Sequence, residues 1–248
     1  MLWMDAARAL YSWTNREMAR RTISPTRPDS QSKSGEDRPG TREQLLEAAG
    51  QIFAEKGFER STAKEICERA HTNTAAVNYY FGGIEALYVA ALEEARDRVF
   101  SVQAIGKAIE GKTSPKAKLE AAIGVLVETL LGPVSSSWEL RLLGRDMVTP
   151  SPTSDAAKEK LILPRARILR RFVGELTGLP EDHPAVARGC ITLIAPLCLL
   201  VLADRRVVKR ALPSLGLGPD DAPALAQHMA QYALAGLEAI GRQARREG

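Results

Sequence analysis

Hydrophobic and polar positions follow a helical rhythm along most of the chain. Apolar residues recur every three or four positions, most clearly over residues 115–131, and the two-residue alternation of β-strands is scarce. Ala and Leu, which favour helix, are abundant, while aromatic residues make up only 5% of the chain. The pattern therefore predicts an all-α protein of about nine helices.

Capping residues and glycines mark the ends of these helices. Capping-box patterns begin at Thr41 and Thr62, Asn73 is the expected N-cap of a third helix, and Ser114 with Pro115 is expected to begin a fifth. The expected ends are Gly57, residues 82–83 and Gly132, and the fourth helix is expected to reach past Phe100. Pro164 lies inside a helix predicted over 153–177 and is expected to kink or break it.

Two C-terminal segments predict a dimer. One helix is expected from His183 to about Val208 and another from Ala222 to Ala244. The first is apolar on nearly every face in its middle, so it must be covered on all sides, and a second copy of the chain is the simplest cover. Its longest apolar run, Cys190 to Ala203, is too short to cross a bilayer, so we expect a cytoplasmic homodimer without membrane contact.

Composition divides the chain into three expected parts. Residues 1–40 end in a run rich in Pro, Gly and Ser and are expected to be a disordered basic extension. Residues 41–88 are expected to form a three-helix DNA-binding domain, and residues 89–248 a helical domain that forms the dimer. Within the middle part, Thr62 to Phe81 predicts two short helices joined by a tight turn. This is a helix-turn-helix, which lays its second helix in the major groove of DNA.

Charge is distributed unevenly between these parts. The formal net charge of +4 suits a polyanionic partner. Residues 41–88, however, carry five Lys and Arg residues against seven Glu residues, so binding there must depend on where side chains lie. In the extension, arginines that would touch DNA phosphates or a minor groove stand at Arg8, Arg16, Arg20, Arg21 and Arg27. The alternative for the extension is a disordered leader or an over-called start codon.

No pattern typical of catalysis or metal binding is visible. Cys67, Cys190 and Cys198 lie in apolar contexts without paired spacing, so we expect reduced, buried thiols, with a redox-sensing thiol as the alternative. The three histidines are isolated, and neither a nucleophile–base pair nor a Gly-rich phosphate loop is present. We therefore expect no metal, no cofactor and no enzymatic activity.

The motifs of the chain resemble a known family. The helix-turn-helix segment, with the run from Val77 to Gly83, resembles the TetR family of one-component transcription regulators. The segment from Trp138 to Met147, followed by Pro150 and by the Ile-Leu-Pro at 162–164, is similar to the CecR-like branch. The resemblance covers about residues 41–215. It implies a homodimer that binds a palindromic operator and responds to an unknown small-molecule effector in its C-terminal domain.

The resemblance implies a set of residues that contact double-stranded DNA. Lys64 would approach a base edge or a phosphate, the front of the recognition helix would face bases, and its aromatic end would contact the backbone. The expected DNA-binding residues are Thr62, Lys64, Asn73, Thr74, Ala75, Ala76, Asn78, Tyr79 and Tyr80.

The chemistry of these side chains leaves alternatives open. Tyr79 and Tyr80 suit phosphate contact because a phenol donates one hydrogen bond from a rigid arm. The alternative is that one of the two rings packs in the core, against the first and fourth helices. Asn78 suits an adenine edge, a phosphate or an internal cap. Asn73 is expected mainly as a cap, whereas Thr62 and Thr74 suit both capping and phosphate contact.

The chain departs from the family pattern at two positions. The family usually has Gly where His71 stands, at a turn that often needs positive φ. It usually has Lys where Ile84 stands, and loss of that phosphate contact should lower the salt dependence of binding by about one unit.

The C-terminal domain offers candidate effector contacts. Residues expected to line an effector pocket are Trp138, Arg141, Arg145, Asp146 and Met147, with Arg145 and Asp146 orienting a polar ligand. The alternative is an internal salt bridge in a buried seam. The branch usually has Glu where Asp146 stands. The sequence thus predicts a ligand-responsive DNA-binding repressor, with a helical ligand-binding dimer that has lost DNA affinity as the alternative.

Overall fold

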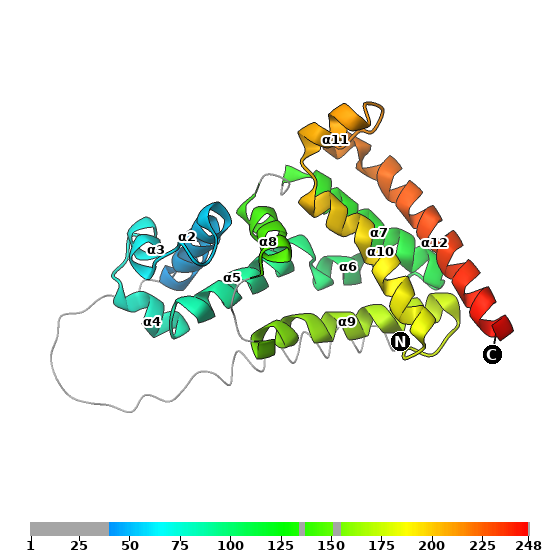
Figure 1. Cartoon of the computed structure of the whole chain (residues 1–248), viewed down its shortest axis with the longest axis horizontal. Coiled ribbons are helices and arrows are strands. Elements are labelled where there is room, and N and C mark those ends of the chain that lie inside the picture. Colours follow the sequence, from blue (N-terminus) through cyan, green and yellow to red (C-terminus); the bar gives the residue numbers. More distant parts are fainter. Residues whose placement is uncertain (1–39, 134–136, 151–154, 248) are drawn as a thin grey trace.

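The computed structural model describes residues 40–133, 137–150 and 155–247. The expectations for the extension 1–39 therefore lie outside the described residues. The described chain contains helices and no strand (Figure 1). The helices are α2 (Thr41–Lys56), α3 (Ala63–Arg69), α4 (Ala75–Phe81), α5 (Ile84–Val99), α6 (Val102–Ile109), α7 (Pro115–Leu131), α8 (Trp138–Val148), α9 (Asp155–Thr177), α10 (Pro184–Leu202), α11 (Arg205–Ala211), the short 3₁₀ helix η2 (Pro219–Asp221) and α12 (Ala222–Glu247). The predicted all-α fold is confirmed.

Most expected helix ends are found, with their caps. The Thr62 hydroxyl accepts a hydrogen bond from the Glu65 N–H at 3.2 Å, and the Ser114 hydroxyl accepts one from the Ala117 N–H at the start of α7. The capping box at Thr62 is only half made, because the Glu65 carboxylate pairs with Lys56 instead. The expected cap at Thr41 is wrong: Thr41 is already helical, and Gly40 stands at the cap with φ 108°.

Two expected helices are each divided into two. The fourth helix ends at Val99, and the Ser101 hydroxyl then accepts from the Ala104 N–H to begin α6. The C-terminal apolar helix ends at Leu202, and Asp204 accepts from the N–H groups of Arg206 and Val207 to begin α11. At each division a polar residue, Ser101 or Asp204, caps a new helix. The periodicity of apolar residues does not indicate these caps. Helix α9, by contrast, is not broken at Pro164.

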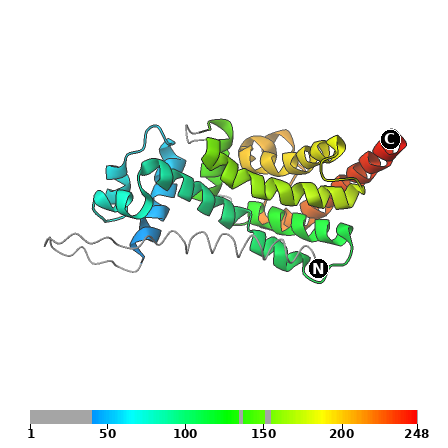
Figure 2. The same ribbon diagram turned by 90° about the horizontal axis from the view of Figure 1, so that it is seen from below.

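The helices form two groups at opposite ends of the molecule. Helices α2, α3 and α4 gather at one end of the molecule, and α7, α9, α10 and α12 lie at the other (Figures 1 and 2). Helices α5 and α8 lie between them and pack on both α2 and each other. The expected boundary at residue 88 falls inside α5, which runs unbroken from the end of α4 toward the second group of helices.

Helix α10 exposes much of its apolar surface. Ile191 is 70% exposed and Leu199 63%, and both lie beside Ile194 and Leu202. By length and composition alone this helix of 19 residues could cross a membrane, although the apolar run from Cys190 to Ala203 is by itself too short. Only 33% of its apolar window is buried within the chain, so much of this apolar surface is exposed in the single chain, as at sites where proteins contact a partner.

Candidate nucleic-acid interface

The recognition helix α4 presents an exposed, polar front. The Asn73 carboxamide oxygen accepts from the Ala76 N–H at 3.1 Å and thereby caps the helix, as expected. Thr74, Ala75 and Asn78 are exposed, and Tyr79 is 77% exposed. An exposed tyrosine on a helix with a polar front is suited to an external partner that accepts hydrogen bonds, as phosphate does.

A broad groove of about 1290 Å³ runs beside this front, between α2 and the helix-turn-helix. Of the expected DNA-binding residues it gathers Asn73, Ala75, Ala76, Tyr79 and Tyr80. The other expected residues, Thr62, Lys64, Thr74 and Asn78, are exposed but do not line the groove.

The groove also has a wall that the motif did not indicate. Thr41, Gln44 and Gln51 of α2 line it, along with Thr72 of the turn. The sequence indicates the α2 part of this wall by the helical spacing of its polar residues, on the side of α2 away from the apolar stripe.

Two residues expected at the interface are partly or wholly covered. Ala76 is only 7% exposed and packs in the core, so it offers little surface to a base. Tyr80 is half-buried against the core, and its ring meets that of Tyr79 edge-on, with centroids 4.8 Å apart. Tyr80 thus supports Tyr79, which matches the alternative of core packing for one of the two rings.

The turn before α4 holds His71 in a left-handed conformation. Its φ is 53°, and among the described residues it is the non-glycine residue with positive φ. This confirms that the position requires the conformation that glycine adopts most readily.

Residues 41–88 are called the reading domain below, for the role expected of them, and each of their five Lys and Arg side chains has a contact within the chain. Lys56 pairs with Glu65, Lys64 with Glu68 at 3.9 Å, and Arg69 with Glu55 at 2.9 Å. Arg42 lies over the Phe81 ring at 5.0 Å, and Arg60 donates to the Lys56 carbonyl. Hydrogen bonds from Arg69 hold the pKa of Glu55 below its usual range. These carboxylates offset the positive charge that would attract a phosphate.

The start of α5 lacks a cation at the expected phosphate contact. Ile84 is half-buried and packs against the core, so it closes the domain instead of reaching outward. Its neighbour Glu85 adds a negative charge to the first turn.

The three cysteines are free thiols, of which Cys67 and Cys190 are buried as expected and Cys198 is only partly buried. Burial raises the pKa of the Cys67, Cys190 and Cys198 thiols, which disfavours the reactive thiolate. Within residues 40–133, 137–150 and 155–247, no three His, Cys, Asp or Glu side chains come together as a metal site.

The expected effector residues lie on α8, at the junction with the reading domain. Trp138 is 6% exposed, and its indole N–H donates to Glu47 of α2 at 2.7 Å. Arg145 donates to the Glu55 carbonyl at 3.2 Å. Asp146 accepts from the Tyr88 hydroxyl at 3.0 Å and pairs with Arg96 at 3.5 Å. Arg141 is exposed, as is Met147. Asp146 therefore lies in a seam between helices and forms an internal ion pair, which is the alternative to an effector contact.

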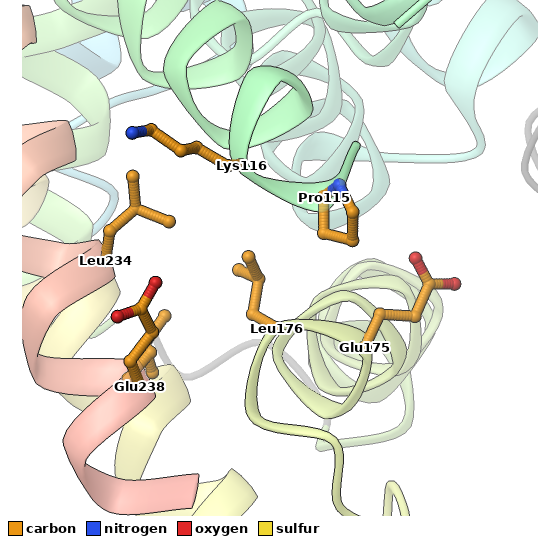
Figure 3. Close-up of a pocket in the computed structure, with 7 residues that line it drawn as sticks. Pro115, Lys116, Glu175, Leu176, Leu234 and Glu238 are labelled. Carbon is orange, nitrogen blue, oxygen red and sulfur yellow. The ribbon is translucent and has the colours of Figure 1, made fainter. Parts of the chain in front are cut away.

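A separate pocket lies away from this junction, in the group of helices at the other end of the molecule. It is lined by residues of α7, α9 and α12, among them Lys116, Glu175 and Glu238, which Figure 3 labels. Its volume of about 140 Å³ is small beside the roughly 300–1,000 Å³ typical of ligand pockets. It includes none of the expected effector residues.

Family models match both parts of the chain. Residues 45–91 match the model of the bacterial regulatory proteins of the TetR family. Residues 115–240 match the C-terminal domain of the HTH-type transcriptional dual regulator CecR.

Curated relatives and solved structures agree with these matches. The chain is 25% identical to the HTH-type transcriptional repressor NicS of Pseudomonas putida, over 69% of this chain and 80% of NicS. It is 24% identical to the dual regulator CecR of Shigella flexneri, over 68% and 79% of the two chains.

Two solved structures share the fold at low identity. A TetR-like regulator from Rhodococcus sp. RHA1 superposes with a TM-score of 0.57 at 19% identity, covering 80% of this chain and 98% of that one. FadR from Bacillus subtilis, solved with stearoyl-CoA, gives 0.56 at 16% identity, covering 78% and 98%. The proteins of this family are DNA-binding transcription regulators and not enzymes. With a helix-turn-helix at one end and a CecR-type helical domain at the other, the chain belongs to the TetR family of transcriptional regulators.

Proposed function

We propose that the protein is a cytoplasmic, ligand-responsive repressor that binds a palindromic operator as a homodimer. Residues 41–88 read the DNA, and residues 89–248 bind the effector and form the dimer. The observation that carries the DNA-reading role is the exposed front of α4, where the capped N-terminus and Tyr79 line one groove. A repressor role is supported by the likeness to NicS, whereas CecR is a dual regulator.

The dimer is supported by the uncovered apolar face of α10. Ile191, Ile194 and Leu202 recur at three- and eight-residue steps along one side of the helix, and Leu199 lies beside them. Tyr232 on α12 is 74% exposed and adds aromatic surface. A two-fold pairing of these helices would bury the patch and set the spacing of the two recognition helices.

The effector acts, in this proposal, by shifting the population between two separations of the recognition helices. The pocket beside Lys116 is small, and the α8 residues contact α2 and α5. FadR of B. subtilis, which shares the fold, was solved with stearoyl-CoA. A tenfold change in operator occupancy needs a differential affinity of only about 1.4 kcal/mol.

Fluorescence anisotropy with the DNA upstream of the gene tests the proposal. We expect salt-dependent binding to this duplex and weak binding to an unrelated one, measured at two salt concentrations. Equal, weak binding to both duplexes would favour a ligand-binding dimer with lost DNA affinity, which the internally paired cations and Ile84 support. An Ile84→Lys variant separates the cases, since only a weakened reader should gain affinity and about one unit of salt slope.

Side-chain variants test the roles within the reading domain. Tyr79→Phe removes one hydroxyl from the exposed ring and should weaken binding to all sequences alike, because phosphate contacts carry no sequence information. Lys64→Ala should also change sequence preference if Lys64 reads a base edge. Equal losses across operator variants for both substitutions would exclude base reading by Lys64.

A further inference from the structure

Helix α8 of the regulatory part inserts a tryptophan into the reading domain. Trp138 begins α8 and lies against Gly50, in the middle of α2. A Cβ added at Gly50 would come within 2.6 Å of three ring carbons of Trp138. The indole therefore occupies space that any side chain at position 50 would fill, and its N–H anchors to Glu47 one turn earlier.

A polar cluster encloses this tryptophan seat. Arg98 of α5 lies over the indole ring at 5.5 Å and donates to Glu139 of α8 at 2.8 Å and Glu47 of α2 at 3.2 Å. One guanidinium thus joins three helices. Burial alone would lower the pKa of Arg98, but its hydrogen bonds with Glu139, Glu94 and Glu47 raise it well above the usual value. Glu139 is 7% exposed, so the charge pair is partly shielded from water.

The rest of α8 continues the connection toward α10. Asp146 and Arg145 contact α5 and the end of α2, as described above. On the opposite side, Gly144 faces Val201 and Leu202, at the end of the helix with the uncovered apolar face. Figure 1 shows α8 between α2 and α10, and the helix packs on both. A displacement of α10 would therefore reach α2 through one rigid helix.

We propose that Trp138, seated at Gly50 and held by Glu47 and Arg98, is the positioning residue that locks the reading domain to the regulatory domain. It contacts no DNA. It fixes the orientation of α2, and with it the recognition helix, relative to α10. The effect on operator choice rests on the proposed function, because only a dimer that binds two half-sites reads their separation. The mechanical coupling itself does not require DNA.

Gly50→Ala is the most informative variant because it should favour the helical conformation of α2 and at the same time disrupt the packing of Trp138 on α2. Alanine is favoured over glycine inside a helix, so α2 itself should be no less stable. The added methyl group nevertheless expels the indole from its seat. Gly124→Ala is the matched control, since it makes the same change inside α7, where nothing lies within 4 Å of the added atom.

Calorimetry of the full chain without DNA tests the coupling. We expect one unfolding transition for the wild type and for Gly124→Ala, and two separate transitions for Gly50→Ala, because the domains then unfold independently. Trp138→Phe keeps an aromatic ring but removes the N–H that binds Glu47. We expect it to act in the same direction, and non-additively with Gly50→Ala, because both variants alter one seat. A single, unshifted transition in Gly50→Ala would overturn the proposal.

Operator spacing tests the functional consequence. The wild type should prefer the native operator over a duplex with about five base pairs, half a helical turn, inserted between the half-sites. Gly50→Ala should lose roughly tenfold of this discrimination, about 1.4 kcal/mol, while Gly124→Ala retains it. A purely structural defect would lower affinity for both duplexes equally, and that result would overturn the positioning role. If the wild type binds no duplex specifically, the proposed function fails, and calorimetry still decides the coupling.

Discussion

At the scale of single residues, His71 shows a conformational cost built into the turn of the helix-turn-helix. The left-handed conformation at φ 53° costs an L-residue about 1–2 kcal/mol relative to glycine, and the greater entropy of unfolded glycine offsets part of this. His71 is exposed, and its position is set by the backbone that links α3 to α4.

His71→Gly should therefore stabilise the chain. We expect a gain of about 0.5–1 kcal/mol in the free energy of unfolding, measured by urea titration followed by circular dichroism. His71→Asn should fall between the two, because Asn tolerates the left-handed region better than most residues. A loss of stability in His71→Gly would show that the imidazole makes a stabilising contact that outweighs the backbone cost.

At the scale of elements, α10 combines a buried face with an exposed apolar one. Val186, Gly189, Leu193 and Leu197 pack into the chain, while Ile191 and Leu199 lie on the outside. Periodicity alone indicated a helix that is covered on all sides. It could not separate the face covered by the chain itself from the face that needs a second copy.

Leu199→Asp should break the proposed dimer. Its side chain is 63% exposed in the single chain, so the monomer should keep its fold, but a dimer would have to bury an unpaired carboxylate. We expect a shift from dimer to monomer in sedimentation equilibrium. Val148→Asp, at a 72% exposed position on α8, is the control and should leave the mass unchanged. A dimeric Leu199→Asp variant would place the contact elsewhere.

The sequence predicted elements well where local signals determine them. Caps at Thr62, Asn73 and Ser114, and the glycine ends, appear where expected, because each depends on neighbours within four residues. The seat of Trp138 was not foreseeable, since Gly50 and Trp138 are distant in the sequence and only packing brings them together. For the same reason the sequence leaves both an effector pocket and a buried seam open for the α8 residues, and only packing places them at the junction with α2 and α5.

At the scale of the whole molecule, the Arg98 cluster links stability to pH. Hydrogen bonds from Ser137, its own backbone and Arg98 outweigh burial, which alone would raise the pKa of Glu139, and hold that pKa below the usual value. A carboxylate with a depressed folded pKa contributes stability above the unfolded pKa of about 4.3, and this contribution is lost as pH falls through the folded pKa.

Glu139→Gln measures this contribution. At neutral pH we expect the variant to be less stable by about 1 kcal/mol, a modest value because Arg98 is 44% exposed and water screens the pair. Because the wild-type carboxyl becomes neutral in acid, the difference should shrink as pH falls below about 4.3. Urea titrations at several pH values provide the test, and a difference that grows in acid would contradict the assignment.

The pairing of three of the five cations of residues 41–88 with glutamates has a consequence for how the protein finds its site. General attraction to DNA comes almost wholly from cation–phosphate contacts, and a genome offers about 10⁶–10⁹ competing positions. Here Lys56, Lys64 and Arg69 already share their charge with glutamates. We therefore expect few molecules to be sequestered along the chromosome at any moment, so that a small number of copies per cell is enough to keep the operator occupied.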